Sequence, residues 1–182
     1  MKNQPNLNAA KIVFLDESSI NLGMTRLYGR ASKSERVNDY VPDVRFQRIS
    51  ILSTVRLDGK QVPFIFRGTL NGELFKKYIE DMLAPTLSEG DIVIMDNSSV
   101  HKVNGVCAPI VLRGAKVLYL PPYSPDFNPI ELLWSKMKAF SRKRKACTHE
   151  NLVEALNSAL DYITLDDIAA WFKHDGYSIN NC

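Results

Sequence analysis

The chain has 182 residues, of which 45% are hydrophobic and 24% are charged, with 9 glycines and 9 prolines. This composition is typical of one globular domain with a real core, and it excludes collagen-like, low-complexity and largely disordered chains. No apolar run approaches the roughly 18–20 residues of a membrane span, and the first ten residues include no apolar signal segment. We therefore expect a cytoplasmic protein. Neither a disulfide framework nor a thiolate metal site is indicated, because the three cysteines are far apart and form no C-x-x-C pair: Cys107, Cys147 and Cys182.

The net charge of +3 is distributed unevenly along the chain. Residues 136–145 include six basic side chains and no acid, whereas residues 146–182 carry a net charge of −5. The first 145 residues therefore carry +8. A polyanionic partner such as nucleic acid is expected for this part of the chain and not for the acidic tail.

The first part of the chain predicts a strand, a long loop and two further strands. Residues 11–16 are a short apolar run that ends in an acid, whereas residues 17–47 have no clear period and are rich in Arg, Ser and Asn. Residues 48–57 are apolar and β-branched, and Asp58-Gly59 is a strong hairpin signal that leads into residues 61–67. We therefore expect two antiparallel strands after the first one.

The second part predicts helices that alternate with buried strands. Apolar side chains recur with helical spacing over residues 71–83, and Pro85 helps to end this helix. Residues 91–96 and 115–120 are buried-strand runs separated by a short helix at about 103–112, an arrangement that produces parallel pairing. Three helices follow, at about 129–145, 149–162 and 165–173. The prediction is one α/β domain with a five-stranded mixed sheet, in which a three-strand antiparallel meander is joined by two parallel strands and flanked by helices.

Three acids mark a candidate metal site. Asp16 and Asp96 end two predicted strands, and Glu131 lies in the first turn of the helix after the last strand. Strand ends of α/β sheets open into a crevice where ligands bind, so we expect these side chains to converge. Oxygen ligands without His or Cys suit Mg²⁺ or Mn²⁺ rather than zinc. Two such ions can activate a water or hydroxyl and stabilise the departing oxygen of a phosphodiester, so the pattern indicates phosphoryl transfer.

Each acid also has a purely structural interpretation. Asp16 could end a strand and bond its own loop amides, and Asp96 opens an Asp-Asn-Ser run that is typical of an Asx turn. Asn128, Pro129 and Glu131 fit the N-cap, N1 and N3 positions of a capping box, in which the glutamate bonds the cap amide. No single acid therefore decides between structure and chemistry.

Three sequence blocks combine these acids: FLDESSINLG, IVIMDNSSVHK and LYLPPYSPDFNPIELLWSKMK. They resemble the catalytic blocks of bacterial insertion-sequence transposases related to the Tc/mariner superfamily, which are DDE transposases with a ribonuclease H-like fold. The third block is the most specific, and the 34 residues between Asp96 and Glu131 are the spacing that the resemblance implies. The resemblance covers about residues 11–145. It departs slightly at Ser98-Ser99-Val100, where small or Gly residues are usual before His101.

The resemblance implies a ribonuclease H-like catalytic domain that cleaves DNA at transposon ends and joins the freed 3′-hydroxyl to target DNA at a TA dinucleotide. Asp16, Asp96 and Glu131 match the metal-binding triad, in which the two aspartates would bridge two Mg²⁺ or Mn²⁺ ions and Glu131 would hold one of them. The implied partner is double-stranded DNA, bound by a homodimer in the nucleoid of a bacterial cytoplasm. We expect residues 1–10 to be a polar lead-in and residues 11–182 to be a single catalytic domain with C-terminal helices. The helix-turn-helix region that reads the element's ends is expected as a separate or frameshift-fused segment.

Polar residues around the triad are candidate DNA contacts. Lys138 and Arg142 share the helical face of the triad glutamate and could follow a DNA backbone or form a solvated basic face. His101 could orient a phosphate or the nucleophile, or it could make a structural hydrogen bond. Glu17 and Asp126 are spare acids that could support the triad from behind. The full set of candidate DNA contacts is Arg26, Arg30, Lys33, Arg36, His101, Lys102, Lys138 and Arg142.

Two other functions stay open. The chain could be an inactive or regulatory DNA-binding fragment, although an intact triad argues against this. Another enzyme of the same fold, such as a resolvase or ribonuclease, is disfavoured by the 34-residue spacing and the proline-rich third block. The last two helices look like a helix-turn-helix, but their negative charge would repel DNA, so we expect them to cap the fold. Trp134, which has helical spacing with Ile130 and Met137, is expected in the core.

Overall fold

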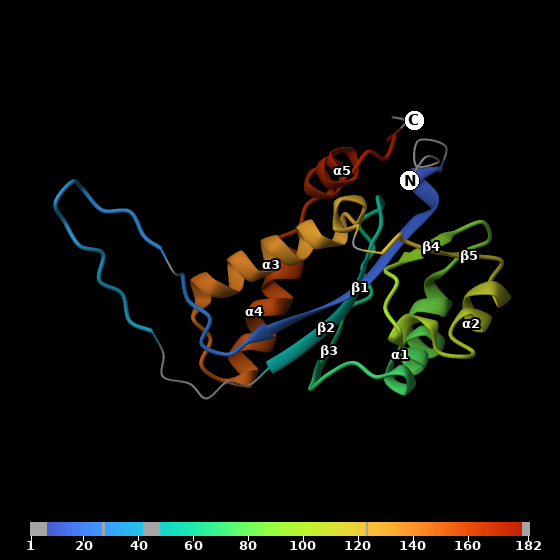
Figure 1. The fold of residues 1–182 in the computed structure, drawn as a ribbon, viewed down its shortest axis with the longest axis horizontal. Helices are drawn as coiled ribbons and strands as arrows, with labels where there is room; N and C mark the ends of the chain where they lie inside the picture. Colours follow the sequence, from blue (N-terminus) through green and yellow to red (C-terminus); the bar gives the residue numbers. More distant parts are fainter. Residues whose placement is uncertain (1–6, 27, 42–47, 123, 180–182) are drawn as a thin grey trace.

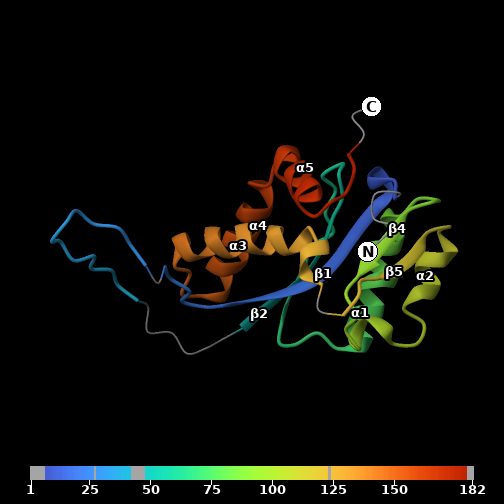
Figure 2. The same cartoon turned by 45° about the horizontal axis from the view of Figure 1, so that its top comes forward.

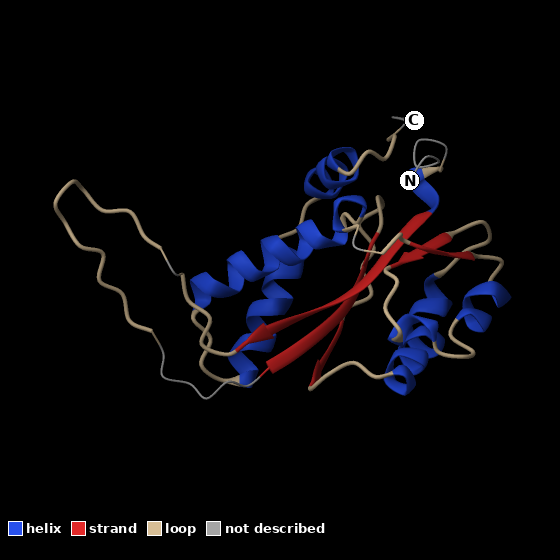
Figure 3. Ribbon diagram, in the orientation of Figure 1, coloured by secondary structure: helices blue, strands red, loops and turns tan. Residues whose placement is uncertain are grey.

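Strand β1 lies at the centre of a five-stranded sheet with the order β3-β2-β1-β4-β5 (Figures 1 and 3). The structure is a computed structural model that describes residues 7–26, 28–41, 48–122 and 124–179. Strands β1, β2 and β3 pair antiparallel, whereas β4 pairs parallel with β1 and β5 pairs parallel with β4. The predicted mixed sheet is therefore confirmed. The strands are β1 (Ile12–Asn21), β2 (Arg48–Val55), β3 (Phe64–Arg67), β4 (Ile92–Met95) and β5 (Lys116–Tyr119).

Helices cover both faces of this sheet (Figures 1 and 2). One face packs against the helices α3 (Ile130–Arg144), α4 (His149–Asp161) and α5 (Leu165–His174). The other face packs against α1 (Gly72–Tyr78) and α2 (Cys107–Leu112). Alternate residues of β1 point to opposite faces, so Phe14 joins the first cluster while Val13 and Leu15 join the second. The start of β1 is apolar throughout because it is buried on both sides.

Strand β1 is longer than the sequence predicts. Residues 17–21 are expected in a loop, but β1 continues to Asn21 and pairs with β2 from Phe14 to Asn21. Strand β4 pairs with β1 only as far as Leu15. Asp16 therefore lies within β1 and not at its end, although it stands where the parallel neighbour stops. From Asp16 onward, β2 is the only strand paired with β1 among the described residues, and this open edge explains why the sequence here is polar.

The connection between β2 and β3 is longer than the tight hairpin that the sequence predicts. Asp58-Gly59 does form a turn, because Gly59 has a φ of +78° and its N–H donates to the Arg56 carbonyl at 3.1 Å. Strand β3, however, begins only at Phe64. Before it, the Val62 N–H donates to the Thr54 hydroxyl at 3.1 Å instead of to a ladder carbonyl.

The helices follow the predicted order with some different bounds. The α-helical part of the segment 71–83 ends at Tyr78, and the chain continues as a π-helical turn at Ile79–Leu83 and a 3₁₀ turn at Ala84–Thr86 that includes Pro85. Helix α2 starts at Cys107 rather than near residue 103. The three C-terminal helices are confirmed.

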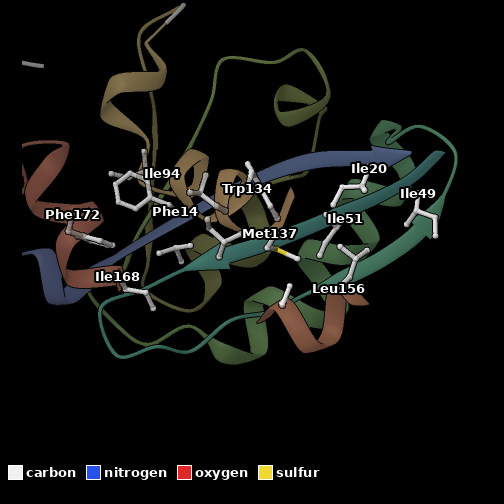
Figure 4. Packing of buried hydrophobic residues seen from close by; sticks show 14 of the residues in the cluster. Phe14, Ile20, Ile49, Ile51, Ile94, Trp134, Met137, Leu156, Ile168 and Phe172 are labelled. Atoms are coloured by element: carbon white, nitrogen blue, oxygen red, sulfur yellow. The ribbon is translucent and has the colours of Figure 1, made fainter. Parts of the chain in front are cut away.

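The C-terminal helices pack onto β1 and α3, as expected for a cap on the fold. The rings of Phe14 and Phe172 meet edge to face with centroids 5.3 Å apart, and Trp134 and Met137 are buried in the same cluster (Figure 4). The ammonium of Lys136 in α3 pairs with a carboxylate of α5. The predicted core position of Trp134 is therefore confirmed, and the acidic tail is part of the packed structure.

A buried acid ties together the start of β1, the start of β4 and the end of β2. The side chain of Asp91 is fully buried, with Oδ2 2.9 Å from Arg56 Nη1 and Oδ1 3.8 Å from Lys11 Nζ. Burial raises the pKa of Asp91, but the Ser88 N–H and the Arg56 guanidinium outweigh it and hold this pKa below its ordinary value. Asp91 is therefore a charged structural residue.

Two smaller expectations concern membranes and cysteines. No helix within the four described ranges is long and apolar enough to cross a membrane. Cys107 and Cys147 are free thiols, as expected. Cys182 and residues 1–6 of the predicted lead-in lie outside the described residues.

Candidate active site

Asp16 is a buried carboxylate on the face of β1 that packs against α3. It is only 6% exposed, Trp134 Nε1 donates to its Oδ2 at 3.4 Å, and the Glu17 N–H donates to its Oδ1 at 2.8 Å. Burial, together with the nearby carboxylates of Glu17, Glu131 and Asp96, raises the pKa of Asp16 to about 7. The surrounding protein therefore disfavours the charged form of this acid.

Asp96 follows β4 directly and is better exposed to solvent. Its Oδ1 accepts a hydrogen bond from the Ser98 N–H at 2.9 Å, which is the predicted Asx turn. The same oxygen lies 2.6 Å from His101 Nδ1. Burial raises the pKa of Asp96, but His101 and the Ser98 amide outweigh it and hold this pKa below its ordinary value. Asp96 thus forms the Asx turn and is also a candidate metal ligand.

His101 lies between two carboxylates and not on the surface. Its ring is fully buried, with Nε2 3.0 Å from Glu17 Oε2 and Nδ1 facing Asp96. Burial lowers the pKa of His101, but the two carboxylates outweigh it and raise it to about 9, so the ring is positively charged at neutral pH. Of the two predicted roles of His101, this geometry favours the structural contact over a contact with DNA, because both ring nitrogens lie beside acids and solvent does not reach them.

Glu131 is exposed in the first turn of α3. The capping box is not formed: Pro129 occupies the N-cap position and no side chain caps this helix. The Glu131 N–H donates to the Asn128 backbone carbonyl at 2.9 Å, while Asn128 Oδ1 is buried with no hydrogen-bond partner among the described residues. Burial raises the pKa of Glu131, as Asp96 does, whereas Lys138 lowers it. The structural alternative for Glu131 is therefore wrong, and the carboxylate is available for other contacts.

Asp16, Asp96 and Glu131 lie close enough for their charges to interact, and two pockets meet at Glu131. One pocket has a volume of about 500 Å³ and includes Asp96, Asn128 and the proline-rich segment after β5. The other has a volume of about 310 Å³ and lies along the open edge of β1. Its polar lining consists of Glu17, Ser18, Ser19, Arg48, Ser50, Thr69, Glu131 and Lys138. Among the described residues, no group of three or more His, Cys, Asp or Glu side chains is arranged to hold a metal ion.

The structure separates the candidate DNA contacts into two groups. Lys138 lines the pocket beside Glu131, and Arg142 is half-buried one turn further along α3. Lys102 is exposed, with its ammonium 5.7 Å from the centre of the Tyr119 ring. The other four basic residues are exposed on a segment that projects from the body of the molecule (Figures 1 and 2): Arg26, Arg30, Lys33 and Arg36.

We call this projecting segment, residues 24–26 and 28–41, the arm. The Lys145 ammonium at the end of α3 pairs with the Asp39 carboxylate and donates to the Tyr40 carbonyl at 3.3 Å. The side chains of Tyr28 and Tyr40 are about 90% exposed. The arm is therefore tied to the body near one end, while its basic and aromatic side chains face solvent.

Some site residues carry no signal in the sequence. Arg48, Ser50 and Thr69 line the pocket beside Glu131, but they belong to no motif and only the pairing of β1 with β2 brings them there. Glu17 is the spare acid that the structure places beside the triad. Asp126 is exposed in a 3₁₀ turn before α3.

Known proteins share both the sequence pattern and the fold. The family described as DDE superfamily endonuclease matches residues 11–153. A pre-cleavage Mos1 transpososome has 15% identity and a TM-score of 0.70, covering 94% of this chain and 58% of that chain. The mariner Mos1 paired-end complex with Mg has 16% identity and a TM-score of 0.72, covering 91% and 53%. The catalytic domain of Mos1 mariner transposase has 14% identity and a TM-score of 0.63, covering 94% and 85%.

These matches differ in what they establish. No curated protein sequence matches the chain. The solved structures share the fold at low sequence identity, and the chain spans just over half the length of the Mos1 chains in the two complexes. The family match, by contrast, covers most of the chain and includes all three triad acids. The chain belongs to the DDE superfamily endonuclease family, and it has the ribonuclease H-like fold of the Mos1 transposase catalytic domain.

Proposed function

We propose that this domain cleaves DNA strands at transposon ends and joins the freed 3′-hydroxyl to target DNA, using two Mg²⁺ or Mn²⁺ ions held by Asp16, Asp96 and Glu131. The observation that carries this proposal is the environment of Asp16. Its carboxylate is buried among three other acids, and no Lys or Arg of the described chain contacts it. A buried anion in such a place is costly unless a cation joins it.

The donors at this site fit a hard divalent cation. All three candidate ligands are carboxylates, which Mg²⁺ and Mn²⁺ prefer. The one imidazole nearby, that of His101, has both nitrogens directed at Glu17 and Asp96, so it is not free to act as a ligand. Mos1 complexes solved with Mg and with Mn share this fold, which supports the same choice of ions here.

Each carboxylate would have its own role. When bound, the two ions would activate a water or 3′-hydroxyl as the nucleophile and stabilise the departing oxygen. Asp16 and Asp96 would bridge the ions, and Glu131 would hold one of them. Trp134 fixes Asp16 through its indole N–H, and the Ser98 amide orients Asp96.

The surroundings of the triad suit double-stranded DNA. The two pockets that meet at Glu131 would admit the strand on either side of the reacting phosphate. Lys138 and Arg142 would follow the DNA backbone along α3, with Lys102 as a further contact beyond Asp96. The basic side chains of the arm would hold DNA or the second protomer of a homodimer.

Recognition of specific DNA ends belongs elsewhere in this proposal. The acidic helices α4 and α5 pack against α3 and β1 and are poorly suited to a phosphate backbone. We assign residues 11–182 to one catalytic domain and the reading of terminal repeats to a separate or fused region. A bacterial cytoplasm, with the protein associated with the nucleoid, is the proposed location.

The test compares nicking of supercoiled plasmid DNA in Mg²⁺ or Mn²⁺ by the full chain and by two variants. We expect Asp96→Asn to lower the nicking rate by at least about 100-fold, because one ligand shared by both ions is lost. Asp81→Asn is the matched control, since Asp81 is exposed on the turn after α1. Thermal unfolding of both variants checks that they are folded.

Three results would oppose the proposal. Undiminished nicking by Asp96→Asn would remove Asp96 from the chemistry. Faster cleavage of an RNA–DNA hybrid than of DNA duplex would indicate a ribonuclease. Binding of DNA without cleavage in either metal would favour the inactive or regulatory fragment.

A further inference from the structure

The position of Asp96 is not determined by the sheet alone. Strand β4 ends at Met95, so Asp96 stands on the loop that follows, and its side chain is 47% exposed. Within the loop, only the Ser98 N–H holds its carboxylate. Asp16, in contrast, belongs to a paired strand and is buried. The proposed metal site therefore needs something else to fix Asp96 relative to β1.

His101 and Glu17 supply a direct connection between the two strands. Glu17 is the neighbour of Asp16 on β1, and its Oε2 lies 3.0 Å from His101 Nε2. The opposite ring nitrogen, Nδ1, lies 2.6 Å from Asp96 Oδ1, a close charge contact whose angle is outside the range of a hydrogen bond. The imidazole thus spans from the strand that carries Asp16 to the loop that carries Asp96.

The ring itself is held from two sides. It lies against Phe75 of α1, with ring centroids 4.6 Å apart, and it is fully buried. The Tyr119 hydroxyl of β5 donates to the His101 backbone carbonyl at 3.0 Å. Because Phe75 packs against the ring and Tyr119 holds the backbone that carries it, the two ring nitrogens present a rigid spacer to the two carboxylates.

Stability alone does not explain this arrangement. Burying an imidazole between two acids costs desolvation, and an apolar side chain of similar size would pack against Phe75 without that cost. Residues that orient metal ligands from behind are a common device of metal sites, and their loss weakens metal binding.

We infer that His101 and Glu17 are positioning residues, which hold the Asp96 carboxylate at a set distance from Asp16 and so preform the site for the divalent ions. The inference rests on the proposed function, because it requires Asp16 and Asp96 to be ligands. It assigns no contact with DNA or with the metal to either positioning residue.

The test measures Mn²⁺ binding to the full chain by calorimetry in the absence of DNA, so that catalysis does not enter. We expect Glu17→Ala to weaken Mn²⁺ binding by roughly 10-fold, in the range known for residues that support metal ligands. Glu17→Gln keeps an oxygen acceptor for His101 and should restore most of the affinity. Glu73→Ala, at an exposed position on α1, is the matched control and should bind Mn²⁺ normally.

Variants of His101 test the connection from its other end. In His101→Asn, the amide nitrogen can take the place of Nδ1 and donate to Asp96, but it cannot reach Glu17. We expect Mn²⁺ binding to weaken by roughly 10-fold, and adding Glu17→Ala to this variant should weaken it no further, because the two residues act through one contact. Should His101→Asn fail to fold, Glu17→Ala still decides the matter, since Glu17 is partly exposed.

The possible outcomes separate this inference from the proposed function. If Asp96→Asn binds Mn²⁺ as the unmodified chain does, both fail. If Asp96→Asn loses Mn²⁺ while Glu17→Ala binds it normally, the positioning role alone is wrong. If Glu17→Ala and Glu17→Gln lose the same amount of Mn²⁺ affinity, and if this loss adds to that of His101→Asn, Glu17 is a direct ligand and the inference is overturned. A lowered melting temperature with unchanged Mn²⁺ affinity would show that the contact serves only the fold.

Discussion

The two halves of strand β1 have opposite characters. From Ile12 to Leu15 the strand pairs with β4, from Phe14 onward it also pairs with β2, and every side chain of this half is fully buried and apolar. From Asp16 to Asn21 it pairs only with β2, and most of its side chains are polar and partly exposed. The change occurs where β4 ends. One continuous strand thus places apolar side chains in the core with its first half and polar groups beside the proposed active site with its second, because the loss of one neighbour opens its edge to solvent.

Removing an apolar side chain from the first half should have the largest effect on stability. We expect Phe14→Ala to lower the free energy of unfolding by about 3–5 kcal/mol, since it leaves a cavity between Phe172 and Tyr177. Urea denaturation followed by circular dichroism measures this change. A loss below about 1 kcal/mol would mean that the first half of β1 is not the stable part of the strand.

A substitution in the ionic network of Asp91, which precedes the first half of β1, should have the next largest effect on stability. We expect Asp91→Asn to cost roughly 2–3 kcal/mol at neutral pH, because Arg56 loses the charge of a buried partner. The pKa of Asp91 is lowered by folding, so its contribution is complete above the ordinary carboxyl value of 3.8 and is lost as the pH falls through the lower folded value. Denaturation at pH 6 and near pH 3 should therefore show a difference between protein and variant that shrinks in acid. A difference that grew in acid would contradict this assignment.

A substitution of the buried acid in the second half of β1 should raise the stability of the protein instead of lowering it. We expect Asp16→Asn to raise the free energy of unfolding of the metal-free protein by about 1–2 kcal/mol at pH 8, because a buried charge is removed. Folding raises the pKa of Asp16 from 3.8 to about 7, so the charge destabilises the fold progressively as the pH rises between these values. The gain should be small near pH 4 and largest above pH 7. Denaturation in the presence of a chelator measures it, and a variant that is less stable at pH 8 would refute this view of Asp16.

The smallest effect on stability is expected for a substitution at the open edge of β1, beyond Leu15. Ser19→Ala should change the free energy of unfolding by less than about 0.5 kcal/mol, since Ser19 lies in the polar pocket and not in the core. Its hydroxyl should instead contribute to DNA binding, with affinity falling by a few-fold in a fluorescence anisotropy titration at fixed salt. Ser178→Ala, at an exposed position in the C-terminal tail, is the control. A large loss of stability in Ser19→Ala would mean that the second half of β1 supports the fold as the first half does.

Sequence patterns predicted the sheet well where burial was complete. The apolar runs around Phe14 and Ile94 indicated strands, and the helix between β4 and β5 indicated their parallel pairing. The pattern failed at residues 17–21, where a strand with one open edge is polar enough to look like a loop. The pattern also predicted a tighter hairpin at Asp58-Gly59 than the structure has, because the dipeptide specifies the turn but not the residue at which the strands pair again.

The candidate site was predicted unevenly. The three acids were predicted from their positions and from the family resemblance, and in the structure they lie close enough for their charges to interact. His101 was predicted either to contact a phosphate or the nucleophile or to make a structural hydrogen bond, since a histidine near a candidate catalytic acid gives no sign of which way its ring points. Its burial depends on Phe75, which lies 26 residues earlier in the chain. The capping box at Glu131 was wrong because Pro129 took the N-cap position.

The sequence by itself determined the class of fold, the order of its strands and the identity of the three acids. These follow from local hydrophobic patterns and from a motif, both of which are carried by neighbouring residues. Only the tertiary structure decided that Asp16 is buried beside Trp134, that His101 links Glu17 to Asp96, and that β1 has an open edge beyond Leu15. Those features depend on where separate strands and helices end relative to one another. Burial and charge at the site are therefore properties of the assembled sheet, because they arise from groups that meet only after folding.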